Sequence, residues 1–170
     1  ECRIDAIAQS WAVISGMAGT DKAQMAMASL ETHLIDWQDG IAQLCTPPFR
    51  HHVSDPGYIQ GYPPGIRENG GQYTHGAIWA IYAYAKLGET EMAARLFALI
   101  NPLNHALTQD DARRYKVEPY VISGDVYSVA PHRGRGGWSW YTGAAGWSYR
   151  AGLEAILGIR RAGTRLTIHP

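Results

Sequence analysis

Residues 73–100 read YTHGAIWAIYAYAKLGETEMAARLFALI, and they carry the strongest helical pattern of the chain. Apolar side chains recur every three or four residues over 73–87, which is the spacing of an amphipathic helix. Gly88 interrupts the pattern, which then resumes over 89–100. Because a glycine directly after the last apolar residue commonly ends a helix, the stretch predicts two antiparallel helices joined by a tight turn.

The same periodicity predicts a second helical hairpin nearer the N-terminus. One helix is expected over 4–17 and another over 22–34, with Thr20 or Asp21 as the N-cap of the second. A last helix is expected over 142–159. Arg160 and Arg161 would suit its carboxyl end, where the helix dipole favours cations.

Two long segments between these helices, 35–72 and 101–140, are predicted to be irregular loops. Prolines and glycines interrupt both, and such residues forbid long helices. Alternating residues at 165–170 predict a short strand. We therefore expect an all-α fold of about five helices, arranged as a barrel of paired helices with the long loops gathered at one mouth.

Composition excludes several function classes. Lys and Arg number 15 and Asp and Glu number 15, so no basic excess favours nucleic acid or an anionic membrane. Cys2 and Cys45 fit neither a disulfide framework nor a zinc motif, which favours a reducing, cytoplasmic setting. Six Trp and ten Tyr against two Phe suit a sugar-binding site, because these rings have apolar faces and polar tips. A core rich in large residues is the alternative.

A first polar cluster occupies residues 61–76, where a loop runs into the predicted helix. Gly70 and Gly71 allow backbone N–H groups to approach a ligand closely, and a helix N-terminus favours an anion. Glu68 is expected to accept hydrogen bonds from sugar hydroxyls, and His75 to donate to phosphate. The alternative is a capping loop whose polar groups satisfy their own backbone.

A second cluster occupies residues 131–147, where glycines, hydroxyls, Arg133 and Arg135 precede a helix start. Such a segment can cradle an anion, and Trp138, Trp140 and Tyr141 add stacking surface. The extended segment 118–127 is either a wall of the site or purely structural. The adjacent pair His51–His52 shares no helix or strand face, so no metal site is predicted.

Residues 1–13, 62–75 and 137–143 resemble glycoside hydrolase family 94. Within it, the chain is most similar to the phosphorylase-type region of cyclic β-1,2-glucan synthases and to β-1,2-oligoglucan phosphorylases. The resemblance implies an (α/α)6 barrel, of which 1–162 is the C-terminal part and 163–170 the start of a β-rich domain. It implies reversible, inverting phosphorolysis of β-glucosidic bonds to α-glucose 1-phosphate. Inorganic phosphate is the co-substrate, without metal or organic cofactor.

The resemblance also assigns residues. His75, Thr142 and Gly143 match the family's phosphate-binding positions, and Glu68 matches a glucosyl-site carboxylate. Around it we expect a substrate-binding set formed by Arg67, Tyr62, Gln72, Trp138 and Tyr141.

The family's general acid is an aspartate in a Trp-Asp-Gly motif that lies upstream of the segment matching 1–13. The chain contains no such motif, since Trp37-Gln38-Asp39 lies elsewhere. We therefore expect the acid to precede Glu1 in a longer polypeptide, which leaves this piece inactive alone; the cytoplasmic part of a larger membrane-bound synthase is one alternative for that polypeptide. Asp5 is the alternative within the chain, although an acid at a helix start is more often a cap. A hydrolase on the same barrel and a non-catalytic sugar-binding remnant are the competing functions.

Overall fold

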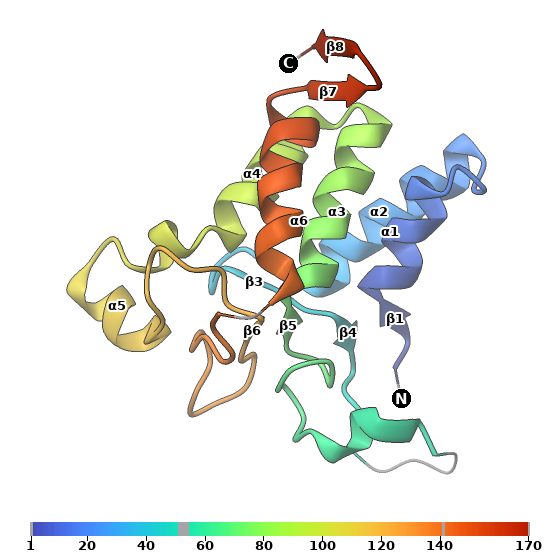
Figure 1. The fold of residues 1–170 in the computed structure, drawn as a ribbon. Coiled ribbons are helices and arrows are strands. Elements are labelled where there is room, and N and C mark those ends of the chain that lie inside the picture. Colours follow the sequence, from blue (N-terminus) through green and yellow to red (C-terminus); the bar gives the residue numbers. More distant parts are fainter. Residues whose placement is uncertain (1, 51–54, 141, 170) are drawn as a thin grey trace.

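Helix α3 (Thr74–Leu87) lies at the centre of the fold, with α1, α4 and α6 packed around it (Figure 1). The computed structural model describes residues 2–50, 55–140 and 142–169. Within them the other α-helices are α1 (Ala6–Ile14), α2 (Thr20–Leu34), α4 (Thr90–Ile100), α5 (Gln109–Tyr115) and α6 (Gly143–Ala151). Short 3-10 helices lie at Gly57–Gly61 and Pro102–His105, and α6 continues as a π-helical turn over Gly152–Ile156.

The strands are short and form antiparallel pairs. The pairs are β1 (Ile4–Asp5) with β4 (Cys45–Thr46), β2 (Ile35–Asp36) with β3 (Ile41–Ala42), β5 (Gln72–Tyr73) with β6 (Asp125–Val126), and β7 (Ile159–Ala162) with β8 (Arg165–Ile168). In the β5–β6 pair, Tyr73 lies opposite Asp125. This pair joins the two long loops directly below α3 and α6.

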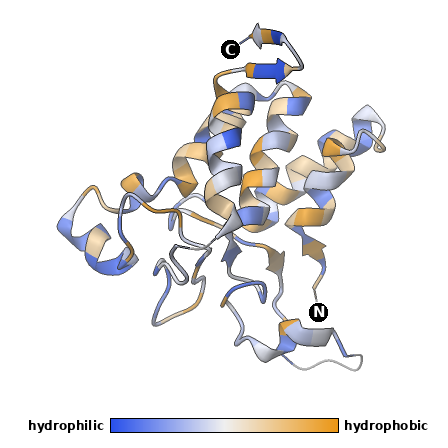
Figure 2. Cartoon of the chain, viewed as in Figure 1, coloured by the Kyte–Doolittle hydropathy of each residue, from blue (hydrophilic) through white to orange (hydrophobic). Residues whose placement is uncertain are grey.

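The core forms around α3, most of whose residues are buried; in Figure 2 apolar residues (orange) alternate with paler ones along the helices. Ile78, Ile81 and Ala83 are completely buried, and a helix buried on most sides needs neighbours around it. Two hydrogen bonds tie α3 to the first hairpin. The Tyr84 hydroxyl donates to the carbonyl of Met27 at 3.0 Å, and Lys86 Nζ donates to the carbonyl of Ile14 at 2.7 Å.

The predicted helices are confirmed, and the two within residues 73–100 begin and end within one residue of expectation. Gly88 has φ +81°, the left-handed conformation expected of a helix-ending glycine. The predicted cap of α2 is wrong. Gly19 is the N-cap, and Thr20 and Asp21 are already helical. Helix α5 was not predicted, because its seven residues are mostly polar and it begins at a local cap in which Asp111 N–H donates to Thr108 Oγ1.

The C-terminal end differs from expectation in one respect. The strand predicted over 165–170 is confirmed as β8, which ends at Ile168, but Arg160 and Arg161 lie in its partner β7 and not at the end of a helix. The helix stops earlier because Gly158, with φ +63°, turns the chain. The expected boundary between 162 and 163 falls at the turn of this hairpin and remains a prediction. None of the helices in the described ranges is long and apolar enough to cross a membrane.

We expect the Ile81→Ala substitution to lower the free energy of unfolding by about 2–5 kcal/mol, since it opens a cavity in the packed centre of the fold. Leu103→Ala is the matched control, because Leu103 is 58% exposed and surface changes usually cost less than about 0.5 kcal/mol. Denaturant unfolding followed by circular dichroism measures both. Equal losses in the two variants would contradict the assignment of α3 as the core helix.

Candidate functional site

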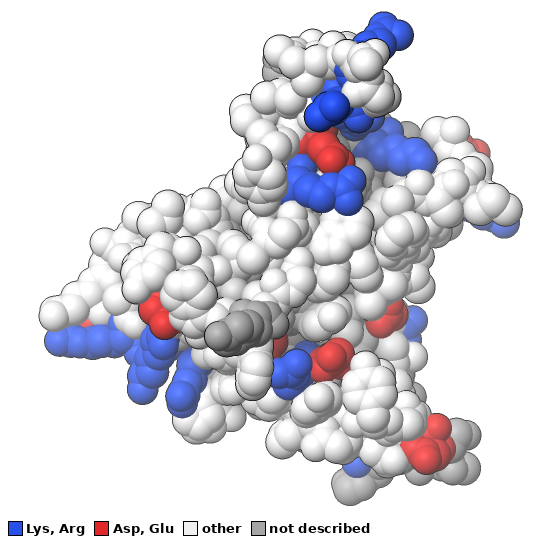
Figure 3. Space-filling view, viewed as in Figure 1, with Lys and Arg blue, Asp and Glu red and all other residues white. Residues whose placement is uncertain are grey.

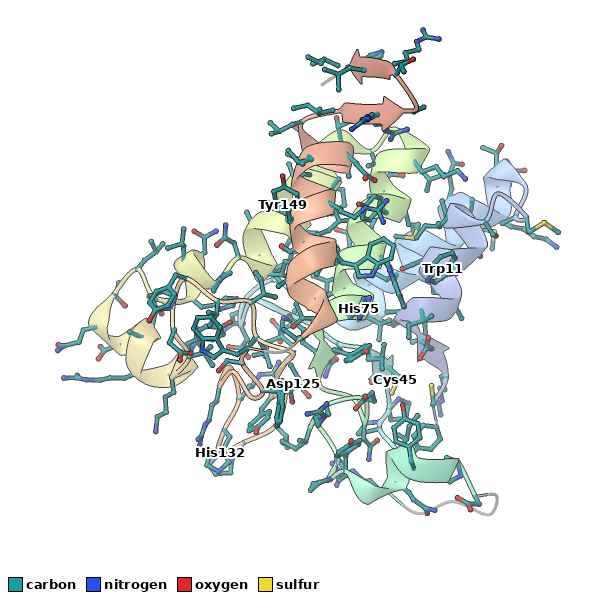
Figure 4. The ribbon with its side chains drawn as sticks, in the orientation of Figure 1. Trp11, Cys45, His75, Asp125, His132 and Tyr149 are labelled. Atoms are coloured by element: carbon teal, nitrogen blue, oxygen red, sulfur yellow. The ribbon has the colours of Figure 1, made fainter. Side chains whose placement is uncertain are left out.

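The N-terminal ends of α3 and α6 meet, and His75 lies at the junction (Figure 4). Thr142 is the N-cap of α6, and its Oγ1 accepts the N–H of Ala144 at 3.2 Å. A Cβ built on Gly143 would lie 3.3 Å from His75 Cε1 and 3.5 Å from His75 Nδ1. The structure therefore brings His75 and the Thr142–Gly143 pair together from two distant parts of the sequence.

The imidazole of His75 carries a polar atom that no described group satisfies. Its Nε2 is buried and has no hydrogen-bond partner among the described residues. Three rings enclose the imidazole at centroid distances of 5.9 Å (Tyr73), 4.6 Å (Trp79) and 5.9 Å (Trp147). Burial lowers the pKa of His75, so the imidazole is neutral at pH 7 and has one N–H to donate. An unpaired buried polar atom costs free energy, which a bound hydrogen-bonding partner would offset.

We expect the His75 imidazole to titrate with a midpoint below its ordinary value of about 6.5, because burial disfavours its charged form. The unfolded chain then binds the proton more readily than the folded protein. The contribution of neutral His75 to stability is thus present above about pH 6.5 and is lost as the pH falls below it. Residue-specific NMR titration of the ring measures the midpoint, and a value at or above 6.5 would contradict the buried environment.

A second polar group lies on the loop before β5. Arg67 Nε and Glu68 Oε2 are 3.6 Å apart, and each is buried without a hydrogen-bond partner among the described residues. The Arg67 guanidinium lies over the rings of Tyr62 (5.4 Å) and Trp138 (5.9 Å). The structure therefore gathers four of the predicted substrate ligands, although Trp138 comes from the other long loop.

Tyr73 lies in β5, between the loop that carries Glu68 and the helix that carries His75. Burial raises the pKa of the Tyr73 hydroxyl, and the Glu68 carboxylate raises it further. The Tyr73 ring lies 5.9 Å from the imidazole of His75. The candidate sugar ligand and the candidate phosphate ligand therefore lie on consecutive elements of the chain, on either side of Tyr73.

A pocket of about 430 Å³ opens beside the N-terminus of α6. Thr142 and Gly143 line one part of it, and Tyr120 and Trp140 line another. Trp140 is 53% exposed, and its Nε1 donates to Glu118 Oε1 at 3.2 Å. The sequence allowed segment 118–127 to be either a wall of the site or purely structural. In the structure, part of this segment lines the pocket.

Two of the sequence expectations are corrected. Gln72 was predicted to bind substrate, but its side chain is buried and its amide is used within the protein. Its Oε1 accepts the N–H of Ala42 at 2.9 Å, and its Nε2 donates to Thr74 Oγ1 at 3.3 Å. Arg133 was expected in an anion cradle, but its guanidinium forms ion pairs with Asp36 and Asp39.

The other candidate residues were an alternative general acid, a sugar-stacking tyrosine and a histidine pair. Asp5 caps α1, since its Oδ1 accepts the N–H groups of Ile7 and Ala8 at 2.8 and 3.0 Å. Tyr141, His51 and His52 lie outside the described residues. Within the described ranges, no group of three or more His, Cys, Asp or Glu side chains is placed to hold a metal ion.

On the face seen in Figure 3, Lys and Arg gather near the top of the molecule and at its lower left, with few Asp and Glu among them. Some of these cations are paired along their own helices, with Arg113 3.2 Å from Asp110 and Arg150 3.0 Å from Glu154.

Asp125 is the residue of this region that sequence reasoning missed. It is 2% exposed, and its carboxylate accepts backbone N–H groups from both long loops. The available signal was an acid between Gly124 and Val126 in an otherwise apolar extended segment, since a buried carboxylate needs hydrogen-bond donors.

Residues 1–158 match the family model described as the glycosyl hydrolase 94 superfamily, catalytic domain. The chain therefore belongs to glycoside hydrolase family 94, and its helical fold agrees with this membership.

Individual relatives are all much longer. Cyclic beta-(1,2)-glucan synthase NdvB of Rhizobium meliloti (strain 1021) is 52% identical over 170 residues, which are 100% of this chain and 6% of the synthase. N,N'-diacetylchitobiose phosphorylase of Vibrio proteolyticus is 29% identical over 172 residues, covering 100% of this chain and 21% of that enzyme. Solabiose phosphorylase of Paenibacillus borealis is 31% identical over 163 residues, which are 95% of this chain and 21% of that enzyme.

Proposed function

We propose that this chain carries the phosphate site and part of the sugar site of an inverting glycoside phosphorylase that acts on β-1,2-linked glucans. The observation that carries the proposal is the unpaired, buried Nε2 of His75 in a ring that lies against Gly143, at the capped N-terminus of α6. Family membership and the phosphorylases among the relatives support the reaction class. The 52% identity to a β-(1,2)-glucan synthase supports the linkage.

Phosphate is the attacking group in this reaction. The N-terminus of α6 carries a partial positive charge that favours an anion, although the N–H groups of Ala144 and Ala145 already donate to Thr142. The imidazole N–H of His75 and the hydroxyl of Thr142 add two donors. A phosphate oxygen forms the new bond to the anomeric carbon from the face opposite the leaving group. The glycosidic bond breaks, its electron pair stays on the leaving oxygen, and the product is α-glucose 1-phosphate.

The sugar is held beside the phosphate by the loop before β5. The Glu68 carboxylate accepts hydrogen bonds from ring hydroxyls, and the Arg67 guanidinium donates to others. The rings of Tyr62 and Trp138 supply apolar faces for the C–H side of a pyranose. The reaction needs no metal or organic cofactor, because phosphate takes the place of the activated water of an inverting hydrolase.

The leaving oxygen needs a proton, and we propose that an aspartic acid elsewhere in a longer polypeptide supplies it. Asp5 is engaged as the cap of α1 through its Oδ1. Asp125 is buried under the loops with both oxygens hydrogen-bonded. The chain also spans only 6% of the synthase and 21% of the phosphorylases that it resembles. In the remainder of an (α/α)6 barrel, the acid would face the sugar site from the other helices.

Product analysis tests this proposal. The full-length protein is incubated with a β-1,2-glucan oligomer with and without inorganic phosphate, and the released sugars are identified by NMR. We expect α-glucose 1-phosphate, formed only when phosphate is present. Release of free glucose without phosphate would instead identify a hydrolase, and binding without any release would identify a non-catalytic sugar-binding protein.

A further inference from the structure

The carboxylate of Asp125 connects the two long loops that form the candidate sugar site. Its Oδ2 accepts the backbone N–H of Arg67 at 3.2 Å, and its Oδ1 accepts the backbone N–H of Trp138 at 2.9 Å. The side chain is 2% exposed and is labelled in Figure 4, where it lies among the loops below His75. A buried carboxylate with a donor on each oxygen is a rigid link.

The backbone next to Trp138 packs directly against the Asp125 carboxylate. A Cβ added to Gly137 would lie 2.1 Å from Asp125 Oδ1, so a side chain at 137 would displace the carboxylate. The N–H of Gly137 also donates to the carbonyl of Asp125 at 2.8 Å. Backbone and side chain of one aspartate therefore hold the segment that presents the Trp138 ring.

The other link holds a strained residue. Arg67 has φ +48°, a left-handed conformation that costs a non-glycine residue free energy and persists only where its surroundings enforce it. The hydrogen bond from its N–H to Asp125 is such an enforcing contact. The Arg67 side chain in turn contacts Glu68 and the rings of Tyr62 and Trp138.

We infer that Asp125 is a positioning residue that sets the geometry of the sugar site by holding Arg67 and Trp138 at a fixed separation. The inference rests on the proposed function, because it assigns those two residues to sugar binding. A carboxylate is required because both oxygens accept hydrogen bonds from N–H groups. An asparagine accepts with one atom only and turns its NH₂ toward the second N–H. Asp125 itself does not contact the substrate.

Asp125→Asn in the full-length protein tests the inference. We expect KM for the glucan to rise by about ten- to a hundredfold, the effect of losing one charge-assisted hydrogen bond, while KM for phosphate changes by less than about threefold. Asp36→Asn is the matched control, since Asp36 also joins two loops by accepting from a backbone N–H and from Arg133. Its KM for glucan should stay within about twofold of the wild type.

Equal increases in both KM values for Asp125→Asn, or an unchanged KM for glucan, would overturn the inference. If the wild type shows no phosphorolysis, the proposed function fails instead, so the two failures are distinguishable. If the Asp125→Asn variant does not fold, amide hydrogen exchange of the unmodified protein tests the same inference. We expect protected N–H groups at Arg67 and Trp138, and exchange at the rates of free loops would also overturn the inference.

Discussion

Residues 1–170 alone, incubated with phosphate and a β-1,2-glucan oligomer, will turn over at least about a hundredfold more slowly than a full-length relative of the enzyme class proposed here. A positioned general acid contributes about a hundredfold to ten-thousandfold to such a reaction, and we place that acid outside the chain. Substrate orientation is lost as well, because part of the sugar site would come from other helices. Release of glucose 1-phosphate per mole of protein measures the difference.

The control for this experiment is phosphate binding to residues 1–170, which should persist because His75, Thr142 and Gly143 all belong to the chain. Turnover comparable to that of the full-length enzyme, from a monomeric preparation, would contradict the placement of the acid. Asp5 would then be the first residue to replace, since only its Oδ1 is used in the helix cap.

Replacing His75 by alanine in the full-length protein will raise KM for phosphate by about tenfold to a hundredfold. The reason is the loss of a hydrogen bond to a charged group, which contributes about 1.5–3 kcal/mol. KM for the glucan should change much less, because the rings around the imidazole, those of Tyr73, Trp79 and Trp147, are not among the residues assigned to the sugar. Initial rates measured over a grid of phosphate and glucan concentrations separate the two constants.

His132→Ala is the control for that substitution, because His132 lies on an exposed loop away from α3. It should leave both constants within about twofold of the wild type. If His75→Ala also leaves the phosphate dependence unchanged, the imidazole has a structural role among Tyr73, Trp79 and Trp147.

The helices of this fold are well predicted from sequence because the signal is local. Apolar spacing and Gly88 are enough to place α3 and α4. The errors occur where the outcome depends on a distant partner. Gln72 was assigned to the substrate because its sequence neighbours are polar, whereas its acceptor is used by Ala42, 30 residues away. The side chain of Arg133 is similarly engaged by acids 94 and 97 residues away.

The candidate site was predictable only in part. A polar loop before a helix indicates a ligand site, but the contact of His75 with Gly143 follows from how α3 packs against α6, which no local pattern shows. The resemblance to family 94 supplied that pairing. Asp125 was missed for the same reason, since the two N–H groups it accepts come from residues 58 positions before and 13 positions after it.

The most direct test of the central claim, that phosphate binds between His75 and the start of α6, is NMR of the His75 ring during a phosphate titration. We expect phosphate, but not chloride at equal ionic strength, to shift the ring resonances of His75 and to raise its pKa from the lowered value of the free protein, because a nearby anion favours the imidazolium. Ring resonances and a pKa that stay unchanged at saturating phosphate would contradict the account.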